Sequence, residues 1–320
     1  MPNLHPTPKT HPAARLWPRA LGLLLAALQA APSHAVENGG IITPPGVYDF
    51  GAGMLPPVSD IGAAAIRVVS TRATRLRDGA GNTSPVRPDL KADLLVLAGL
   101  KMTDKDLLGG KYAYGIVVPV VVNGSLGLRI PTPEGEVQQS GSNRGVGDVQ
   151  LYPVVIQWKP AERLFTNAGL MVQLPTGAYD KHRAFNVGTN HWTIQPNFQF
   201  TYLTAGGLEF SGSTQVNFNT RNPATDYRSG VEFQQDFGVG QHVGDWTIGI
   251  AGYVYRQITG DKGPDVVNGN RARVNALGPA IGFFGPKHHL PLVYMHVYKE
   301  FGARNRVQGT QAAIRASWVF

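Results

Sequence analysis

The sequence predicts an all-β fold, a membrane-spanning antiparallel up-and-down β-barrel of about 12 strands. Three observations carry this prediction: an export leader, long segments of alternating polarity, and a chain that ends in an aromatic residue inside such a segment. The composition agrees, because 39 glycines among 320 residues and a charged content of only 16% suit strands and turns better than helices. Without cysteine, disulfides and thiolate metal sites are excluded.

The leader occupies residues 1–35 and has the three parts of a secretory signal peptide. Basic residues precede the first acid, Glu37, residues 20–31 are apolar, and Ser33 and Ala35 are small residues that a signal peptidase reads. Cleavage is therefore expected near Ala35, followed by localisation in a bacterial outer membrane. Removing three basic residues of the leader lowers the net charge from +8 to +5, which is too mild to predict a nucleic-acid partner.

Alternation is clearest in residues 191–203 and 207–219, where apolar side chains share one face and amides or hydroxyls share the other. A strand sends successive side chains to opposite faces, so these segments are two-faced strands. They are as long as a tilted membrane strand of about 9–11 residues requires, whereas ordinary strands average about 5–6. Residues 91–103 alternate in the same way, with Lys91, Asp93 and Lys101 opposite an apolar face.

Twelve strands are predicted along the rest of the chain. Odd-numbered gaps between them are mostly long and even-numbered gaps mostly short, as in barrels with long external loops and short periplasmic turns. The predicted strands are residues 59–74, 91–103, 111–128, 146–159, 164–175, 190–203, 207–219, 226–240, 245–259, 271–284, 290–303 and 310–320.

The last strand carries a specific signal. Trp318 and Phe320 share its apolar face, and an aromatic C-terminus is the ending that barrel-assembly machinery recognises in outer-membrane proteins. Alternation then predicts that Arg315 and Glu209 face the lumen while Trp318 and Phe210 face lipid. Trp192 and Trp246 also lie near strand ends, as expected of residues at a membrane–water boundary.

The predicted lumen mixes amides, phenols and charges of both signs, which suits a path for neutral or amphipathic solutes rather than an ion-selective pore. The alternative is structural, since side chains can fill a narrow lumen with a hydrogen-bonded network. The residues assigned to this wall are Gln195, Asn197, Gln199, Glu209, Gln215, Asn217, Arg228, Glu232, Asp236, Tyr253, Tyr255, Gln257, Tyr294, His296, Tyr298 and Arg315.

Residues 36–58 are predicted to be an irregular segment that folds into or across the periplasmic mouth. Proline cannot donate to a sheet ladder, and this stretch holds two Pro-Pro pairs and no long alternation. It is also too apolar for a solvated linker, so it is a possible plug in which Tyr48 and Phe50 pack beside an aromatic solute. The alternative is a flexible periplasmic tail.

No catalytic, metal or cofactor site is predicted. His191 and His296 are expected to be polar wall or rim residues, because no serine–histidine constellation surrounds them in the sequence. His288 and His289 are expected in a solvated turn. A calcium site could be built from oxygen ligands in one external loop, but its spacing is not that of an EF-hand, so an ordinary polar loop is favoured. That loop contains Asp261, Asp265, Asn268 and Asn270.

Several short motifs resemble those of the MetA-pathway of phenol degradation family, whose SphA-like members are outer-membrane barrels. The matching pieces are residues 37–40, 51–57, 145–148, 174–179, 190–196 and 277–279, of which Pro175-Thr176-Gly177 with Tyr179 is the most family-like. Val58 departs from the pattern, since the family has a third proline there.

The resemblance implies an outer-membrane channel for small aromatic or other hydrophobic compounds linked to their catabolism, without identifying the solute. The expected partners are outer-membrane lipid, the assembly machinery and that solute. Alternatives are a closed barrel with a structural or sensing role and an outer-membrane lipid-modifying enzyme. The expected organisation is a signal peptide (1–35), the irregular segment (36–58) and the barrel (59–320).

Overall fold

The fold is all β in a computed structural model that describes residues 45–264, 266, 269–285 and 291–320. The described residues belong to one compact unit, and they contain no helix long and apolar enough to cross a membrane. The strands are β1 (Ala63–Arg77), β2 (Arg87–Leu107), β3 (Gly110–Thr132), β4 (Gly135–Val146), β5 (Gln150–Ala161), β6 (Leu164–Gln173), β7 (Thr193–Leu203), β8 (Leu208–Asn219), β9 (Glu232–Val243), β10 (Trp246–Gln257), β11 (Arg273–Phe284), β12 (Leu292–Arg304) and β13 (Arg306–Val319).

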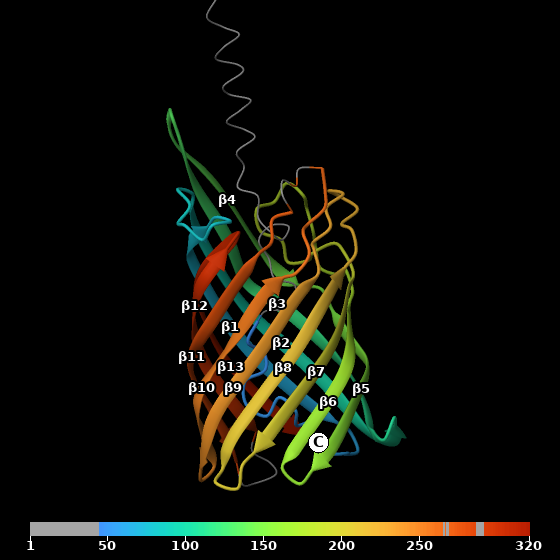
Figure 1. Ribbon diagram of the computed structural model, residues 1–320. Helices are drawn as coiled ribbons and strands as arrows, with labels where there is room; N and C mark the ends of the chain where they lie inside the picture. Colours follow the sequence, from blue (N-terminus) through green and yellow to red (C-terminus); the bar gives the residue numbers. More distant parts are fainter. Residues whose placement is uncertain (1–44, 265, 267–268, 286–290) are drawn as a thin grey trace, which may run out of the picture. The chain divides into compact units, whose positions relative to one another are not determined.

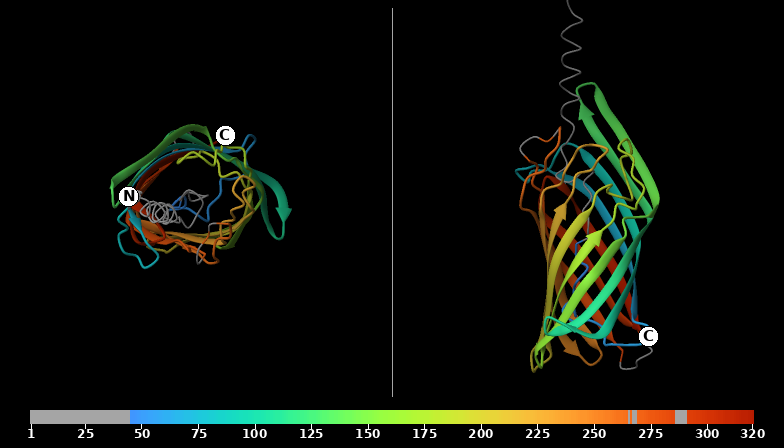
Figure 2. Two further views of the ribbon diagram at one scale, coloured as in Figure 1. Left: turned by 90° about the horizontal axis from the view of Figure 1, so that it is seen from above. Right: turned by 90° about the vertical axis from the view of Figure 1, so that its right-hand side faces the viewer.

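The sheet closes on itself, because β1 pairs antiparallel with both β2 and β13 (Figure 1). Each other strand pairs with its sequence neighbours, except that β4 and β5 pair with β3 and not with each other. β4 and β5 run in the same direction along β3, and together they take the place of one interrupted strand. The wall is therefore a closed 12-strand antiparallel barrel, as predicted, and the ring is visible from above in Figure 2.

The interruption between β4 and β5 has a cause in the sequence of β3. Residues 111–117 of β3 pair with β5, whereas residues 120–132 pair with β4. Pro119 lies where β3 changes its partner from β5 to β4. Because proline has no N–H, it cannot donate a ladder hydrogen bond at this position. The sequence analysis placed residues 129–145 in a long loop, and this was wrong: they form the outer part of a β3–β4 hairpin that projects beyond the ring (Figure 1).

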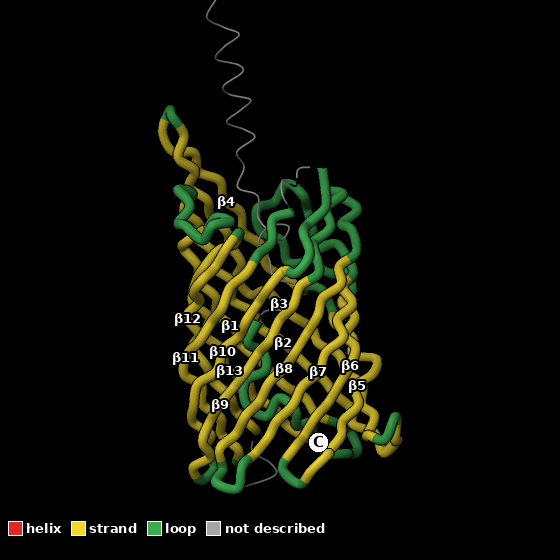
Figure 3. The backbone as a smooth tube through the Cα atoms, viewed as in Figure 1, coloured by secondary structure: helices red, strands yellow, loops and turns green. Residues whose placement is uncertain are grey.

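Loops gather at one end of the barrel and short turns at the other (Figure 3). The end with Phe320 and the turns is here named the C-terminal mouth, and the opposite end the loop mouth. The β2–β3 turn at the C-terminal mouth uses Leu108 and Gly109 with φ of 51° and 76°, the left-handed pair that suits a two-residue hairpin. The β1–β2, β6–β7, β8–β9 and β10–β11 connections at the loop mouth are long, as predicted, whereas short turns join β3 to β4 and β12 to β13.

Side-chain orientation in most of the wall follows the predicted register. Arg315 and Glu209 face the lumen, whereas Phe210 is 38% exposed on the outer face, where Trp318 also lies in register with Ala64. Outward apolar side chains form a belt around the ring; among them are Ile66, Val68, Leu97, Ile194, Phe198, Phe218, Ile248, Ile250, Val297 and Ile314.

In strand β2 the side-chain faces are reversed relative to the other strands, so that charged residues face outward and apolar residues face inward. Its apolar residues Leu94 and Val96 line the lumen, whereas Asp93 faces outward and pairs with Arg72 at 2.8 Å. Asp93 also accepts hydrogen bonds from Ser70 and Asn123 on the neighbouring strands. The charge is thus neutralised locally on the outer wall, which leaves β2 free to turn its aliphatic face inward.

Candidate functional site: the barrel lumen

One side of the lumen is a continuous polar network on β7, β8, β9 and β10. Gln195 donates to Asn217 at 2.7 Å, and Asn217 donates to the Glu232 carboxylate at 2.9 Å. Thr201, Ser211 and Glu209 form a second chain nearer the C-terminal mouth. These side chains are buried against one another, because amides and carboxylates removed from water need hydrogen-bond partners.

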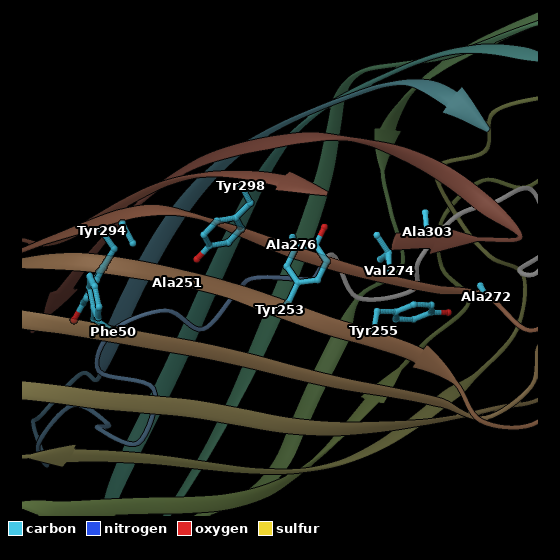
Figure 4. Close-up of a cluster of buried hydrophobic side chains, with 11 residues drawn as sticks. Phe50, Ala251, Tyr253, Tyr255, Ala272, Val274, Ala276, Tyr294, Tyr298 and Ala303 are labelled. Carbon is cyan, nitrogen blue, oxygen red and sulfur yellow. The ribbon is translucent and has the colours of Figure 1, made fainter. Parts of the chain in front are cut away.

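Tyrosines extend the network to β12 and β13. Tyr255 donates to Glu232 at 2.6 Å and Tyr253 donates to Glu300 at 2.7 Å. Glu300 also forms an ion pair with Arg306 at 3.1 Å. Figure 4 shows the rings of Tyr253, Tyr255 and Tyr298 on the inner side of these strands. Their rings pack with small residues of β11, while the hydroxyls of Tyr253 and Tyr255 reach the carboxylates.

Residues 45–56 lie inside the barrel, where several of them bind this polar side, whereas Pro57 and Val58 are exposed. The Asp236 carboxylate accepts hydrogen bonds from three consecutive backbone amides, those of Gly46, Val47 and Tyr48, at 3.1, 3.1 and 3.2 Å. Backbone without regular structure needs such acceptors when it is enclosed away from water. Wall acids therefore replace the sheet ladder that this segment cannot form.

Further contacts fix the segment towards the C-terminal mouth. Gly51 donates to Glu209 at 2.7 Å, Gly53 donates to Thr201 at 2.9 Å, and Asn167 donates to the Ala52 carbonyl at 3.2 Å. The Phe50 side chain is only 1% exposed and packs in the cluster that includes Tyr294 (Figure 4). The described part of the predicted plug therefore occupies the lumen; its effect on permeation stays a prediction.

A third set of contacts joins the segment to β12, β13 and β1. Asp49 lies 3.1 Å from the His296 Nδ1 and 3.3 Å from the Arg315 guanidinium. Arg315 also donates to the Val47 carbonyl, and Arg67 donates to the Gly46 carbonyl at 2.9 Å. The backbone amides of the segment thus contact wall acids, whereas its backbone carbonyls and the Asp49 side chain contact wall arginines.

The opposite side of the lumen is apolar and leaves space. A cavity of about 770 Å³ extends from the segment along strands β1, β2 and β3, and polar side chains of other strands, such as Gln199 and Arg315, also line it. Leu94, Val96 and Val117 line its wall, and Val47 and Tyr48 of the segment face it. Aliphatic side chains offer no acceptor to the amides of the segment, so the segment binds the polar side and the space remains on the apolar side.

Two motifs singled out in the sequence meet at the β4–β5 break. Asp148 accepts hydrogen bonds from the Gly177 amide at 2.8 Å and from the Thr189 amide and hydroxyl, both at 2.7 Å. These contacts hold the β6–β7 loop, residues 174–192, against the inner face of β3, where Phe185 reaches Gly124. In the sequence Asp148 is named only as the end of the family-like motif 145–148, without a role, and Thr189 was missed; an acid directly after Gly147, at a predicted strand start, was the available signal.

The wall residues predicted from sequence are brought together with one exception. Arg228 is exposed in the loop between β8 and β9, where its guanidinium donates to the Asn219 carbonyl. The prediction was wrong because β9 begins at Glu232 rather than at residue 226. The other predicted residues lie on the inner face, and whether a solute passes along them stays a prediction.

Acidic and histidine residues do not gather into a metal site in the part of the chain that the structure describes. His191 is buried in the β6–β7 loop beside Trp192, and His296 lies on the wall strand β12 and contacts Asp49. His288, His289, Asp265, Asn268 and residues 1–44 lie outside the described residues.

Asp261 at the loop mouth is a buried acid with polar partners. It accepts hydrogen bonds from the Tyr227 hydroxyl at 2.5 Å and the Gly230 amide at 2.8 Å, and it contacts Gln257. Burial nevertheless dominates and raises the pKa of Asp261 to about 6, against the opposing effect of these hydrogen bonds. The loop mouth therefore holds a group that titrates close to neutral pH.

The fold resembles that of solved outer-membrane proteins. A channel from Pseudomonas putida F1 is 14% identical, with 87% of this chain and 100% of that chain covered and a TM-score of 0.70. A FadL homologue from Pseudomonas aeruginosa (10% identity, 89% and 98% covered, TM-score 0.40) and the CymD monoaromatic hydrocarbon channel (12%, 90% and 97%, 0.39) are too distant to support an argument. No curated protein sequence matches the chain.

A family model described as "Putative MetA-pathway of phenol degradation" matches residues 73–316. The match covers most of the chain, from within β1 to within β13, and includes the Asp148 region and the β6–β7 loop motif. The chain belongs to this family of phenol-degradation proteins, built as a closed 12-strand barrel.

Proposed function

We propose that the protein is an outer-membrane channel for the uptake of small aromatic or other hydrophobic compounds linked to their catabolism. The observation that carries this proposal is the asymmetry of the lumen, in which a cavity of about 770 Å³ follows an aliphatic wall. A few polar groups facing an apolar surface are typical of sites for small organic molecules. Family membership and the shared fold support the same function and the same location.

In this proposal residues 45–58 act as a plug that narrows the path, and Tyr48 and Phe50 are part of it. The support is that the segment is bound to the wall at three points. The wall residues Glu209 and Asp236 accept hydrogen bonds from its backbone, and its own Asp49 contacts His296. The leader, cleaved near Ala35, would direct export before the barrel assembles. The outer apolar belt would contact lipid.

The protein acts as a transporter and not as an enzyme in this proposal. The imidazole of His296, the wall histidine nearest the segment, is held by Asp49 and stacks on Tyr298 with ring centroids 3.9 Å apart. Among the described residues no hydrogen bond joins this imidazole to a serine, threonine or lysine side chain, so it has no nucleophile to activate.

Uptake of a labelled neutral aromatic compound by Gram-negative cells tests the function. Cells that express the wild-type protein should accumulate benzyl alcohol faster than cells without it, and Leu94→Asn should slow this uptake about three- to tenfold, because it places an amide on the aliphatic path. Leu107→Asn, at the exposed end of the same strand, is the matched control. Equal uptake with and without the protein would disprove the proposal.

The plug is tested separately by deleting residues 36–57 and measuring ion conductance in planar bilayers. Conductance should rise several-fold in a correctly assembled barrel, because the deletion removes the backbone that fills the polar side. Unchanged conductance would favour a closed barrel with a structural or sensing role.

Assembly is proposed to depend on the C-terminal strand. Phe320 directly follows β13 and is 56% exposed at the C-terminal mouth. Deleting Phe320, or changing it to Asp, should lower the amount of folded barrel in the outer membrane while export continues. Heat-modifiable migration of the membrane fraction measures this, and normal assembly of the truncated chain would contradict it.

A further inference from the structure

The Asp49 carboxylate is held between an arginine and a histidine of the wall and is 3% exposed. One oxygen faces the Arg315 guanidinium at 3.3 Å and the other faces the His296 Nδ1 at 3.1 Å. Arg67 lies directly opposite Arg315 on the neighbouring strand and also attracts Asp49 electrostatically. The segment therefore brings its acid to the point where the wall concentrates positive charge.

Two arginines opposite each other on adjacent strands repel, and arginine stays charged in proteins. Their wall neighbour Asp236 is already engaged by the amides of residues 46–48 and by Gln234. Asp49 is thus the acid that neutralises the Arg315 side of the pair. Without it, this wall would present guanidinium and imidazole groups to an enclosed space, which is an arrangement suited to a carboxylate.

The space beside this charge suits an amphipathic ligand. Arg67, Arg315 and Tyr294 all line the cavity, whose far side is the aliphatic wall of β2 and β3. The Arg315 guanidinium lies 4.3 Å from the centre of the Tyr294 ring, so an aromatic surface adjoins the charge. A carboxylate at Arg315 would place its apolar body against Val69 or Val96.

We propose that Arg315, His296 and Arg67 form a binding site for the carboxylate of small amphipathic acids, and that Asp49 occupies this site as an internal competitor. Binding of such an acid would displace Asp49 and release the beginning of the segment from the wall. The inference rests on the proposed function only in that the ligand enters through the same lumen.

Binding of benzoate and of benzamide, its neutral counterpart of similar size, to the purified full-length barrel tests the site. Asp49→Asn removes the competitor and should tighten benzoate binding about ten- to hundredfold, the range for one charge-assisted contact, while benzamide changes less than about twofold. Asp226→Asn, an exposed acid in a loop, is the matched control. Equal gains for both ligands would show that the change merely loosens the segment, and would overturn the proposal.

Arginine variants test the same site from the wall. Arg315→Gln should weaken benzoate binding about tenfold or more without weakening benzamide, and Arg315→Lys should restore most of the binding because it keeps the charge. Arg221→Gln in an outer loop is the control, and Arg67→Gln replaces Arg315→Gln if that variant fails to assemble. Benzoate binding unaffected by the loss of either arginine would overturn the proposal.

Release of the segment has its own measurement. The chain contains no cysteine, so Pro45→Cys provides a single reactive thiol at a buried position of the segment. Its reaction with a water-soluble maleimide should accelerate several-fold with benzoate and not with benzamide; no acceleration would overturn the release. If benzoate binds as described while neutral aromatics are not taken up, the site stands and the proposed function fails. If neutral aromatics are taken up but benzoate is not bound selectively, the proposed function stands and the carboxylate site fails.

Discussion

The two sides of the lumen use buried surface in different ways. On β7–β10, amides and carboxylates such as Gln195, Asn217 and Glu232 bind one another in a network with little free space. On β1–β3, aliphatic side chains such as those of Leu94 and Val96 form no hydrogen bonds, and the cavity of about 770 Å³ lies against them. The polar side thus supports the lumen structurally, and the cavity extends along the apolar side.

The same difference decides where the N-terminal segment binds. Its enclosed backbone amides need acceptors, and only the polar side has carboxylates at the required heights. If the segment lay against β2 instead, its amides would lose these bonds at about 1–3 kcal/mol each. The segment therefore divides the lumen unequally, and the following experiments test that division.

The largest effect is expected for Asp236→Ala. This change removes the shared acceptor of the Gly46, Val47 and Tyr48 amides, and hydrogen bonds to charged groups contribute about 1.5–3 kcal/mol each. The segment should leave the wall in a large fraction of molecules, and planar-bilayer conductance should rise several-fold, up to the value of the barrel that lacks residues 36–57. Asp226→Ala is the control; a conductance equal to that of the wild type would show that Asp236 does not hold the segment.

A smaller effect is expected when the two sides are compared by truncation. Tyr255→Phe removes the hydroxyl that donates to the buried Glu232 carboxylate at 2.6 Å, and should lower the free energy of unfolding by about 1–3 kcal/mol. Val96→Ala, on the side that borders free space, should cost less than about 1 kcal/mol because little packing is lost. Urea unfolding in detergent measures both. Equal losses would mean that the apolar side is packed as tightly as the polar side.

Much of the fold could be predicted from the sequence because a membrane barrel imposes a period of two on long strands. In β7 and β8 the two faces differ strongly, so both their position and their orientation were predicted correctly. In β2 the rule that charges face inward failed, because Asp93 is neutralised on the outer wall by Arg72. In β4 neither face is apolar, so its polar residues were taken for a loop.

The site was predictable only in part, for a similar reason. Strand periodicity identifies the residues that face the lumen but not what they bind there. Thus Asp236 and Glu209 were placed on the wall, whereas their hydrogen bonds to residues 46–51 depend on contacts between distant parts of the chain. The position of Arg67 opposite Arg315 depends on the register between the first and last strands, which no local sequence pattern specifies.

The smallest effect concerns the loop mouth, where Asp261 continues the buried polar network beyond the wall. The pKa of Asp261 is raised to about 6 from an ordinary value of 3.8. Between these values the folded protein binds more protons than the unfolded chain, so stability should increase as pH falls from about 6 towards 3.8 and decrease as pH rises. The slope for one group is at most about 1.4 kcal/mol per pH unit.

The difference in unfolding midpoint between the wild type and Asp261→Asn isolates this group, since the other titrations are shared. The stability of the wild type relative to the variant should increase as pH is lowered through 6, the region where Asp261 takes up its proton. Tyr227→Phe removes a hydrogen bond that stabilises the charged carboxylate, so the same gain should begin at higher pH in that background. A difference that is independent of pH would show that Asp261 is solvated, and that the buried polar network ends with the wall strands.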